Sequence, residues 1–240
     1  MPHYLYKEIG ETPLDLIKTL KTDSNRKYSF AGRLDPMARG QMIILEGEEC
    51  KQTHLYCNLT KIYEFEVLFG FQTDTYDILG LVENFTLTKN NISISLNNYI
   101  GTILQSYPPY SSITIKGQPL WWWSREGKLS EIEIPSKEVS INEIEYLEEV
   151  SITNSLELLE TIKNKIFKLE EGKREGFRVD KIVSKWEEIL LQNNFQPTIR
   201  KFRATVSSGT YIRSLVNRMG EDLGIGAIAL DIHRTRFIEK

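Results

Sequence analysis

The first candidate for chemistry is a carboxylate in a short loop bracketed by glycines. Residues 30–40 are Phe-Ala-Gly-Arg-Leu-Asp-Pro-Met-Ala-Arg-Gly, with Asp35 directly before Pro36. Because the proline ring crowds the preceding residue, Asp35 is restrained towards extended backbone angles, and no helix is expected to run through it. The simplest interpretation is a turn, with Arg33 and Arg39 as solvated loop charges. The alternative is a catalytic aspartate.

A second candidate places an arginine at the start of a helix. Residues 207–213 are Ser-Ser-Gly-Thr-Tyr-Ile-Arg, where a predicted strand turns into a predicted helix. Arg213 falls on the first turn of that helix. Helix N-termini attract anions, and an arginine adds a pair of donors that fits one carboxylate. The alternative is a surface arginine on an amphipathic helix.

Tyr63 and the segment 73–77 are further candidates. Tyr63 lies near the start of a predicted strand, on its apolar face, where most tyrosines belong to the core. Residues 73–77 are Thr-Asp-Thr-Tyr-Asp and contain Asp74. Two carboxylates without further ligands make a poor cation site, so we expect a hydrogen-bonded turn here and no metal.

Residues 105–127 combine aromatic and basic side chains. The run includes three consecutive tryptophans, Trp121 to Trp123, together with Lys116 and Arg125. Aromatic rings stack on bases while cations contact phosphates, so the run suits RNA. Three adjacent side chains cannot share one face, and we therefore expect at least two of the tryptophans to pack in the core.

Hydrophobic periodicity predicts the elements that would position these residues. Alternation predicts strands over 61–70 and 201–206, and helical spacing predicts helices over 13–21, 156–169, 179–190 and 211–222. The last helix has Thr210 as its expected N-cap and Gly224 beyond its end. Residues 171–176 predict a polar loop. Because strands and helices do not alternate regularly, we expect an α+β fold with a mixed, mainly antiparallel sheet flanked by helices.

Overall composition argues against tight, nonspecific nucleic-acid binding. The 240 residues carry 30 Lys+Arg and 33 Asp+Glu, a formal net charge of −3. Seven glutamates and no Lys or Arg fall between Glu138 and Glu160, so we expect this stretch to face solvent, away from any polyanion. A protein partner that binds the acidic insertion, at about residues 150–198, is an alternative. Two cysteines without metal-ligand spacing favour an intracellular location, cytoplasmic by default with nucleus or organelle as alternatives, and no apolar run suggests a membrane span.

Taken together and in this order, these motifs resemble the TruB family of tRNA pseudouridine synthases. The loop matches the family's Gly-x-Leu-Asp-Pro-x-Ala-x-Gly core, and residues 208–213 match its last motif. Further matches lie at Lys7, Gly47-Glu48, Lys61, Tyr63, residues 70–80, Pro109, residues 125–127 and Arg234-Thr235. The resemblance covers residues 7–145 and 200–236.

The resemblance implies the pseudouridine synthase catalytic fold and a role for each matched residue. Asp35 would be the nucleophilic or proton-abstracting carboxylate, Tyr63 the ring stacked against the target uracil, and Arg213 the cation paired with Asp35. The residues expected to contact substrate are Lys7, Phe30, Arg33, Lys61, Asp74, Tyr211 and Ile232. No cofactor and no metal are expected, because the isomerisation involves neither a redox step nor a phosphate.

The resemblance therefore implies an RNA pseudouridine synthase that isomerises a flipped-out uridine in structured RNA, with the T-loop uridine of tRNA as the favoured target. Two alternatives stay open. One is an RNA-binding or RNA-folding module on a synthase scaffold, and the other is a synthase retargeted to another RNA. The sequence does not decide whether the carboxylate attacks the ribose, attacks the base or removes the 2′ proton.

Several positions depart from the family pattern. Phe30 stands where many members have a histidine, Glu8 replaces a proline, and Arg33 replaces a small residue. We expect one catalytic domain over residues 1–240, acting as a monomer, with a helical insertion at about 150–198. Because the chain ends soon after Arg234-Thr235, we expect no C-terminal RNA-binding domain.

Overall fold

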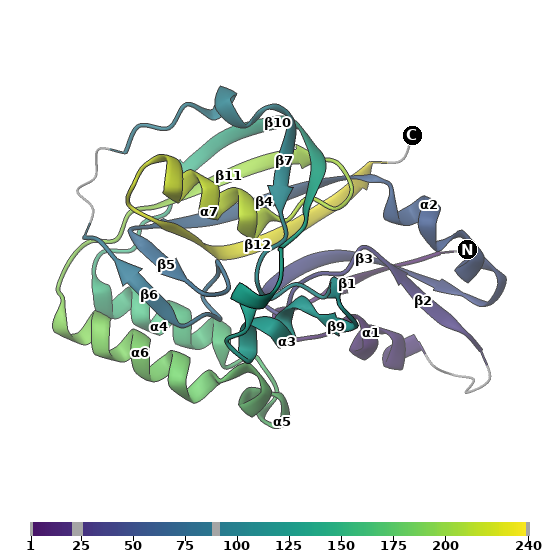
Figure 1. Cartoon of the computed structure of the whole chain (residues 1–240), viewed down its shortest axis with the longest axis horizontal. Helices are drawn as coiled ribbons and strands as arrows, with labels where there is room; N and C mark the ends of the chain where they lie inside the picture. Colours follow the sequence, from purple (N-terminus) through teal and green to yellow (C-terminus); the bar gives the residue numbers. More distant parts are fainter. Residues whose placement is uncertain (1, 21–25, 88–91, 239–240) are drawn as a thin grey trace.

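A central sheet organises the molecule. The computed structural model describes residues 2–20, 26–87 and 92–238. Within them lies an eight-stranded sheet in the order β1-β3-β12-β4-β11-β10-β7, with β2 paired to β3 outside this path (Figure 1). All pairings in it are antiparallel except that of β12 with β3, which is parallel. The predicted α+β fold with a mixed, mainly antiparallel sheet is confirmed.

The elements have the following bounds. The strands of the large sheet are β1 (His3–Lys7), β2 (Tyr28–Ala31), β3 (Ala38–Glu46), β4 (Thr60–Phe69), β7 (Gly101–Ser106), β10 (Ser136–Glu149), β11 (Ile199–Val206) and β12 (Ala227–Ile238). Two small hairpins pair β5 (Phe71–Thr73) with β6 (Val82–Phe85) and β8 (Thr114–Ile115) with β9 (Gln118–Pro119). The α-helices are α1 (Pro13–Leu20), α2 (Thr53–Cys57), α3 (Leu120–Arg125), α4 (Ser155–Ile166), α5 (Glu171–Arg174), α6 (Val179–Gln192) and α7 (Ile212–Asp222). Short 3-10 helices span Gly47–Gln52, Leu96–Tyr99, Leu129–Glu131 and Glu175–Phe177.

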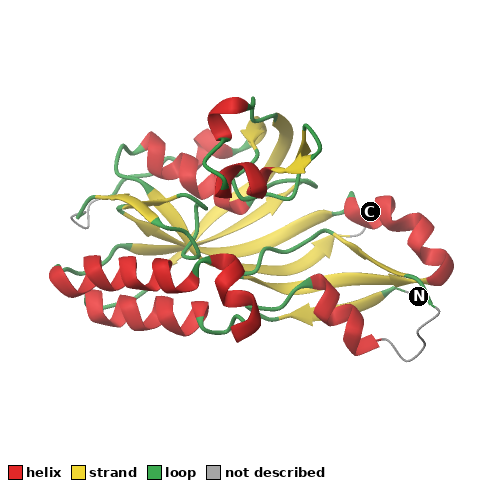
Figure 2. Ribbon diagram, turned by 60° about the horizontal axis from the view of Figure 1, so that its bottom comes forward, coloured by secondary structure: helices red, strands yellow, loops and turns green. Residues whose placement is uncertain are grey.

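Helices cover both faces of the sheet because its central strands are apolar on both sides. Phe65 of β4 and Phe202 of β11 stack in a core cluster that also contains the apolar face of α7. Leu68 of the same β4 strand points into a second cluster, which α4 and α6 close from the other side. Figure 2 shows these two helices running side by side beneath the sheet.

The parallel pairing of β3 with β12 depends on a glycine. At Gly40 (φ +122°) a Cβ atom would lie 2.1 Å from the backbone oxygen of Arg234 on β12. A side chain there would push the two strands apart, and Gly40 follows Asp35 by five residues. The tight approach therefore fixes the end of the loop that carries Asp35 against the sheet.

Most predicted helices and strands are present, and α7 differs at its start. Lys21, the last residue of the first predicted helix, lies outside the described residues. Thr210 does not cap α7: the N-cap residue is Tyr211, and the Thr210 hydroxyl donates to the Ser207 carbonyl instead (3.0 Å). Gly224 does follow the end of the helix, with φ +68°.

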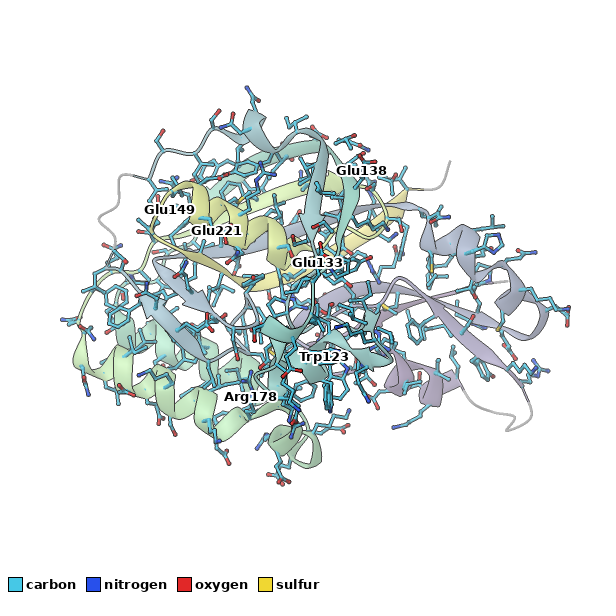
Figure 3. All side chains as sticks on the ribbon, in the orientation of Figure 1. Trp123, Glu133, Glu138, Glu149, Arg178 and Glu221 are labelled. Carbon is cyan, nitrogen blue, oxygen red and sulfur yellow. The ribbon has the colours of Figure 1, made fainter. Side chains whose placement is uncertain are left out.

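One expectation about the middle of the chain is wrong, and another holds. Residues 171–176 do not form a plain loop, because they contain α5 and the start of a 3-10 helix. The glutamates at 138–160 face solvent as expected, with only Glu145 half-buried, and five of the seven lie on strand β10, on which Glu138 and Glu149 are labelled in Figure 3. There Glu145 pairs with Arg203 (2.9 Å) and Glu148 with Lys201 (3.5 Å), so neighbouring strands neutralise part of this acidity.

The expectation that two of the three adjacent tryptophans pack in the core is also wrong. Trp121 is 42% exposed, while Trp122 and Trp123 are half-buried on α3, which itself belongs to the excursion between β7 and β10. Only Leu120 of this helix is buried. In the described ranges no helix has the length and apolar content to cross a bilayer.

We predict that Trp186→Ala destabilises the fold strongly. Trp186 of α6 is fully buried, donates from Nε1 to the Ile78 carbonyl (3.2 Å) and packs 5.2 Å from the Phe71 ring. Its truncation should lower the free energy of unfolding by about 3–5 kcal/mol, since it removes buried area and leaves a cavity. Leu191→Ala, at a 62% exposed position of the same helix, should cost less than about 0.5 kcal/mol. Urea denaturation of both variants measures the difference, and equal losses would contradict this account of the core.

Candidate active site

A salt bridge joins the two residues that the motifs single out. Arg213, on the first turn of α7, donates from Nε to Oδ2 of Asp35 at 2.8 Å. The arginine side chain is 3% exposed, whereas that of Asp35 is 26% exposed. The carboxylate therefore sits at the mouth of the site, and the guanidinium lies behind it.

The loop around Asp35 is held by backbone bonds and by a buried lysine. The Ala38 N–H donates to the Asp35 carbonyl (3.0 Å), and the Gly10 N–H donates to the Pro36 carbonyl (2.9 Å). Lys7 is fully buried and donates from Nζ to the Ala38 carbonyl at 2.6 Å. Burial lowers the pKa of Lys7 to about 8, although the negative charge of Asp35 opposes the shift.

Asp77 is the residue that sequence reasoning missed at this site. It is buried, and its Oδ2 lies 3.7 Å from Nε of Arg213. Its Oδ1 accepts hydrogen bonds from the Thr75 hydroxyl (2.7 Å) and the Leu79 N–H (2.9 Å). The hydrogen-bonded turn predicted for 73–77 is present, but no local pattern shows that it meets a helix more than 130 residues further along the chain.

Two carboxylates and one carbonyl thus surround a single guanidinium. Arg213 also donates from Nη1 to the Thr75 carbonyl at 2.6 Å. Burial alone would lower the pKa of Arg213, but the charges of Asp35 and Asp77 outweigh burial and raise it. Among the described residues, no group of three or more His, Cys, Asp or Glu side chains is placed to hold a metal ion.

Aromatic rings line the same region. Tyr63 of β4 is buried in the core cluster that contains Leu34, the residue before Asp35. The backbone of Tyr211, the N-cap of α7, exchanges two hydrogen bonds with the amide of Gln105 (2.8 and 3.1 Å). Its ring meets Tyr107 edge-on at 5.6 Å. Burial raises the pKa of Tyr211, and the charge of Asp35 adds to the shift, which places this hydroxyl within the electrostatic reach of the carboxylate.

The remaining sequence candidates occupy varied positions. Arg33 is exposed, with its guanidinium 5.6 Å from the centroid of the half-buried Phe30 ring. Ile232 is buried on β12, opposite Ala38 of β3 and Phe65 of β4. The side chains of Arg33 and Phe30 are thus accessible to a substrate, whereas Ile232 belongs to the buried core.

The side chains of Lys61 and Asp74 form hydrogen bonds with other groups of the protein. Lys61 is buried and donates from Nζ to the carbonyls of Cys57 and Leu59, both at 2.7 Å. Asp74 accepts from the Tyr110 hydroxyl (3.0 Å) and from Nη1 of Arg178 (2.7 Å). Asp74 therefore connects the turn 73–77 to the segment between β7 and β10, which bears Trp123, and to Arg178 at the start of α6. Figure 3 shows Trp123 and Arg178 on the same side of the molecule.

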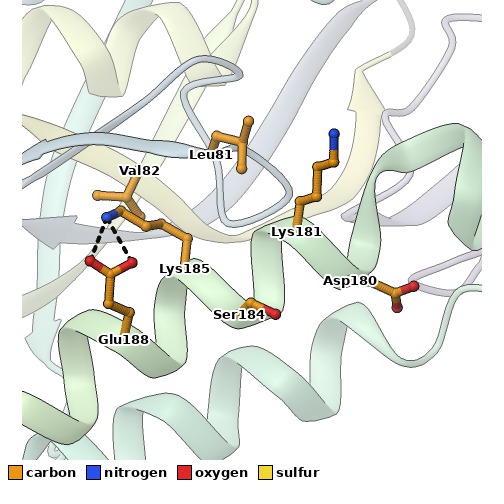
Figure 4. A pocket seen from close by; sticks show the side chains of 7 residues that line it. All are labelled: Leu81, Val82, Asp180, Lys181, Ser184, Lys185 and Glu188. Atoms are coloured by element: carbon orange, nitrogen blue, oxygen red, sulfur yellow. Dashed lines mark hydrogen bonds and ion pairs between the residues drawn. The ribbon is translucent and has the colours of Figure 1, made fainter.

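A shallow cleft beside α6 lies apart from these residues. It is lined by Leu81, Val82, Asp180, Lys181, Ser184, Lys185 and Glu188 (Figure 4). Its charges are mixed, and Lys185 is bound to Glu188 by contacts of 2.8 and 2.9 Å. Nothing in the cleft matches the chemistry of the pair Asp35 and Arg213.

Burial gives Asp77 a pH dependence of unusual sign. It raises the pKa of Asp77 to about 6, while Arg213 opposes the shift. An aspartate in an unfolded chain has a pKa of about 4. Between these two values the folded protein holds a proton that the unfolded chain has released. The contribution of this group to stability therefore falls as the pH rises through that window.

We predict that Asp77→Asn removes this dependence. The difference in melting temperature, variant minus wild type, should increase as the pH rises from about 4 to about 6 and should stay constant above pH 6. Thermal unfolding at several pH values gives the difference directly. Leu191→Ala, at an exposed position of α6, removes no titratable group and is the control that should give a flat difference. A flat or falling curve for Asp77→Asn would show that Asp77 does not titrate in this window.

Comparison with solved structures defines the class of fold. A Cbf5-Nop10-Gar1 complex matches 98% of this chain and 48% of its own chain, with a TM-score of 0.55 and 16% sequence identity. An H/ACA RNP bound to a substrate RNA containing 2′-deoxyuridine gives a TM-score of 0.52 with the same coverage of this chain. At such low identity the likeness concerns the fold, which is the fold that the resemblance implied.

Sequence comparison then gives the family. Residues 18–165, more than half of the chain, match the family model described as TruB family pseudouridylate synthase (N terminal domain). The chain belongs to this family. It is similar to tRNA pseudouridine synthase B of Aquifex aeolicus (strain VF5), with 29% identity over 97% of this chain and 67% of that protein. The Thermotoga maritima protein of the same name is 31% identical over 95% of this chain and 60% of its own length.

The chain spans about 60–67% of the length of these curated relatives. The family match ends at residue 165, inside α4. The single-domain organisation and the insertion at about 150–198 stay predictions.

Proposed function

We propose that this chain is an RNA pseudouridine synthase that isomerises a uridine of tRNA, with the T-loop uridine as the favoured target. The observation that carries the proposal is the partly exposed Asp35 carboxylate, held at 2.8 Å by the buried Arg213 in a chain of the TruB family. The relatives cited above are named tRNA pseudouridine synthase B, which supports tRNA as the substrate.

The geometry suits a reaction that needs one carboxylate and no external reagent. Isomerisation breaks the bond between N1 of uracil and C1′ of the ribose, turns the base and joins C5 to C1′, while C5 loses a proton and N1 gains one. Asp35 attacks the ribose, attacks the base or takes the 2′ proton, and each route starts from a carboxylate presented to the substrate. Arg213 holds Oδ2 in place from the buried side, so the attacking group is oriented before the substrate arrives.

A uridine in structured RNA reaches this carboxylate only after it leaves its stack. Base flipping costs a few kcal/mol, and stacking on an aromatic ring returns about 1–3 kcal/mol per base. Tyr63 and Tyr211 are the rings that the fold brings to the Asp35 region. We assign the stacking role to Tyr63, and Tyr211 borders the other side at the start of α7.

The retained ion pair argues against a binding module that has lost turnover. RNA binding alone gains nothing from a guanidinium buried against two carboxylates, because burial of such charges is costly. Asp35, Asp77 and Arg213 are all present and in contact. We therefore favour the enzyme.

We predict that Asp35→Asn abolishes turnover. An amide cannot act as the nucleophile or base, so the rate should fall by at least about 10³-fold. Tritium release from C5-labelled uridine in a tRNA transcript measures the reaction. Asp180→Asn removes an exposed carboxylate on α6 and should release tritium like the wild type. Equal release by wild type and Asp35→Asn would refute the proposed function.

The excursion between β7 and β10 offers an aromatic surface for the same RNA. Trp121 is exposed, and Lys128 lies 5.3 Å from the centroid of the Trp122 ring. Trp122 and Trp123 meet edge-on at 5.1 Å, and Trp123 donates from Nε1 to the Ile115 carbonyl. The half-buried pair thus anchors α3 and leaves the Trp121 ring facing solvent.

We predict that Trp121→Ala weakens tRNA binding without slowing the chemical step. Loss of one stacking contact of about 1–2 kcal/mol corresponds to a roughly 5- to 30-fold rise in Kd. Filter binding gives Kd, and single-turnover kinetics at saturating enzyme give the rate, which should stay within about twofold. Leu191→Ala, a truncation at an exposed site on α6, should change neither quantity. An unchanged Kd for Trp121→Ala would remove α3 from the RNA surface.

A further inference from the structure

Arg234 of β12 is fully buried, and its donors reach three separate parts of the site. Its Nη2 donates to the Gly32 carbonyl (2.9 Å), and its Nε donates to the Gln41 carbonyl (2.8 Å). Its Nη1 donates to the hydroxyl of Tyr63 over a longer distance of 3.4 Å. Gly32 precedes Asp35 and Gln41 follows it, so one guanidinium holds both ends of the Asp35 loop and the stacking ring.

The burial of this charge is not explained by an ion pair. In the described part of the chain, no carboxylate lies within ion-pair distance of Arg234, unlike Arg213 with its two aspartates. A buried charge costs several kcal/mol, and apolar side chains of similar volume often serve stability as well or better. The ring of Phe237, 4.7 Å from Cζ, offsets only part of this cost. A need for fixed geometry accounts for the arginine better than a need for stability does.

The surroundings of Gly32 show how closely the loop is held. A Cβ atom at Gly32 (φ +70°) would lie 3.3 Å from Nη1 of Arg234 and 3.4 Å from Cε of Lys61. The backbone of Gly32 is therefore packed closely against the side chains of Arg234 and Lys61, both of which are buried. Lys61 is bound to other carbonyls, and burial together with the charge of Arg234 lowers its pKa to about 8. Of these two cations, Arg234 is the one whose bonds extend to the Asp35 loop and to Tyr63.

We propose that Arg234 is a positioning residue that fixes the ring of Tyr63 relative to the carboxylate of Asp35. The inference rests on the proposed function, because it concerns the geometry of that reaction. A flat ring and an attacking oxygen must face the same uracil, and a misplacement of about 1 Å costs on the order of 10²-fold in rate. Arg234 acts through the backbone of the loop and the phenol and does not touch the substrate.

The test compares Arg234→Lys with Lys165→Met. A lysine keeps the charge, but its single nitrogen cannot span the two carbonyls and the hydroxyl. Lys165 pairs with Asp231 (2.8 Å), three residues before Arg234 on the same strand, so its loss perturbs β12 without removing a hydrogen bond to the Gly32 or Gln41 carbonyl or to Tyr63. We expect Arg234→Lys to reduce the single-turnover rate about 10- to 100-fold with Kd for tRNA within about threefold. Lys165→Met should lower the melting temperature and leave the rate within about twofold.

Hydrogen–deuterium exchange supplies a readout that needs no turnover. In Arg234→Lys, peptides covering residues 30–42 should exchange faster, while peptides of α4 and α6 should exchange at the wild-type rate. A wild-type rate of reaction for Arg234→Lys overturns the inference. Faster exchange throughout the protein also overturns it, because the residue would then serve only stability.

A double-variant cycle tests the link to the ring. Tyr63→Phe removes the acceptor of Arg234 and keeps the ring, so Arg234→Lys combined with Tyr63→Phe should be less than additive in its effect on the rate. Strict additivity contradicts positioning through Tyr63. If wild type and Asp35→Asn both fail to release tritium, the proposed function fails. The role of Arg234 in holding the loop is then decided by hydrogen–deuterium exchange over residues 30–42, and unchanged exchange in Arg234→Lys overturns the inference.

Discussion

The buried guanidinium of Arg213 is the constraint on which the rest of the site depends. A charge that is 3% exposed is costly to bury, and opposite charge and hydrogen-bond acceptors in its surroundings offset that cost. Asp35, Asp77 and the Thr75 carbonyl do so, and they come from two segments far from α7 in sequence. Satisfying one side chain therefore requires the β2–β3 loop, the turn after β5 and the start of α7 to meet at one point.

The sheet makes this meeting possible. Strand β11 leads into α7, and β4, next to β11, carries Tyr63 and leads through β5 to the turn of Asp77. That turn is fastened to β12 by the bond from the Ala229 N–H to the Tyr76 carbonyl (3.0 Å). Tyr76 has φ +65°, a strained conformation for a bulky residue. The strained residue thus lies between Thr75 and Asp77, the two residues of this turn that contact Arg213.

Sequence alone predicted the parts that depend on local patterns. Alternating apolar residues gave β4 and β11, helical spacing gave α6 and α7, and motif order gave Asp35, Tyr63 and Arg213 as candidates. Asp77 was missed because its partner lies far along the chain, and a turn motif does not reveal what it faces. The tryptophans were misplaced in the core since hydrophobicity does not show that α3 sits on an excursion with only Leu120 buried. Contacts between distant segments decided each of these cases.

Buried charge also explains how an acidic protein can suit an anionic substrate. Lys7, Lys61, Arg213 and Arg234 are all buried in the region around the Asp35 loop, where the buried or half-buried acids include Asp35, Asp77 and Asp231. Acidic residues such as Glu64 and Glu145 lie instead on the strands of the sheet, where both bind Arg203. The net charge of −3 averages these regions. Charge within about one Debye length of the carboxylate, not the total, governs the approach of a phosphate backbone, and the buried cations around the Asp35 loop contribute to that local charge.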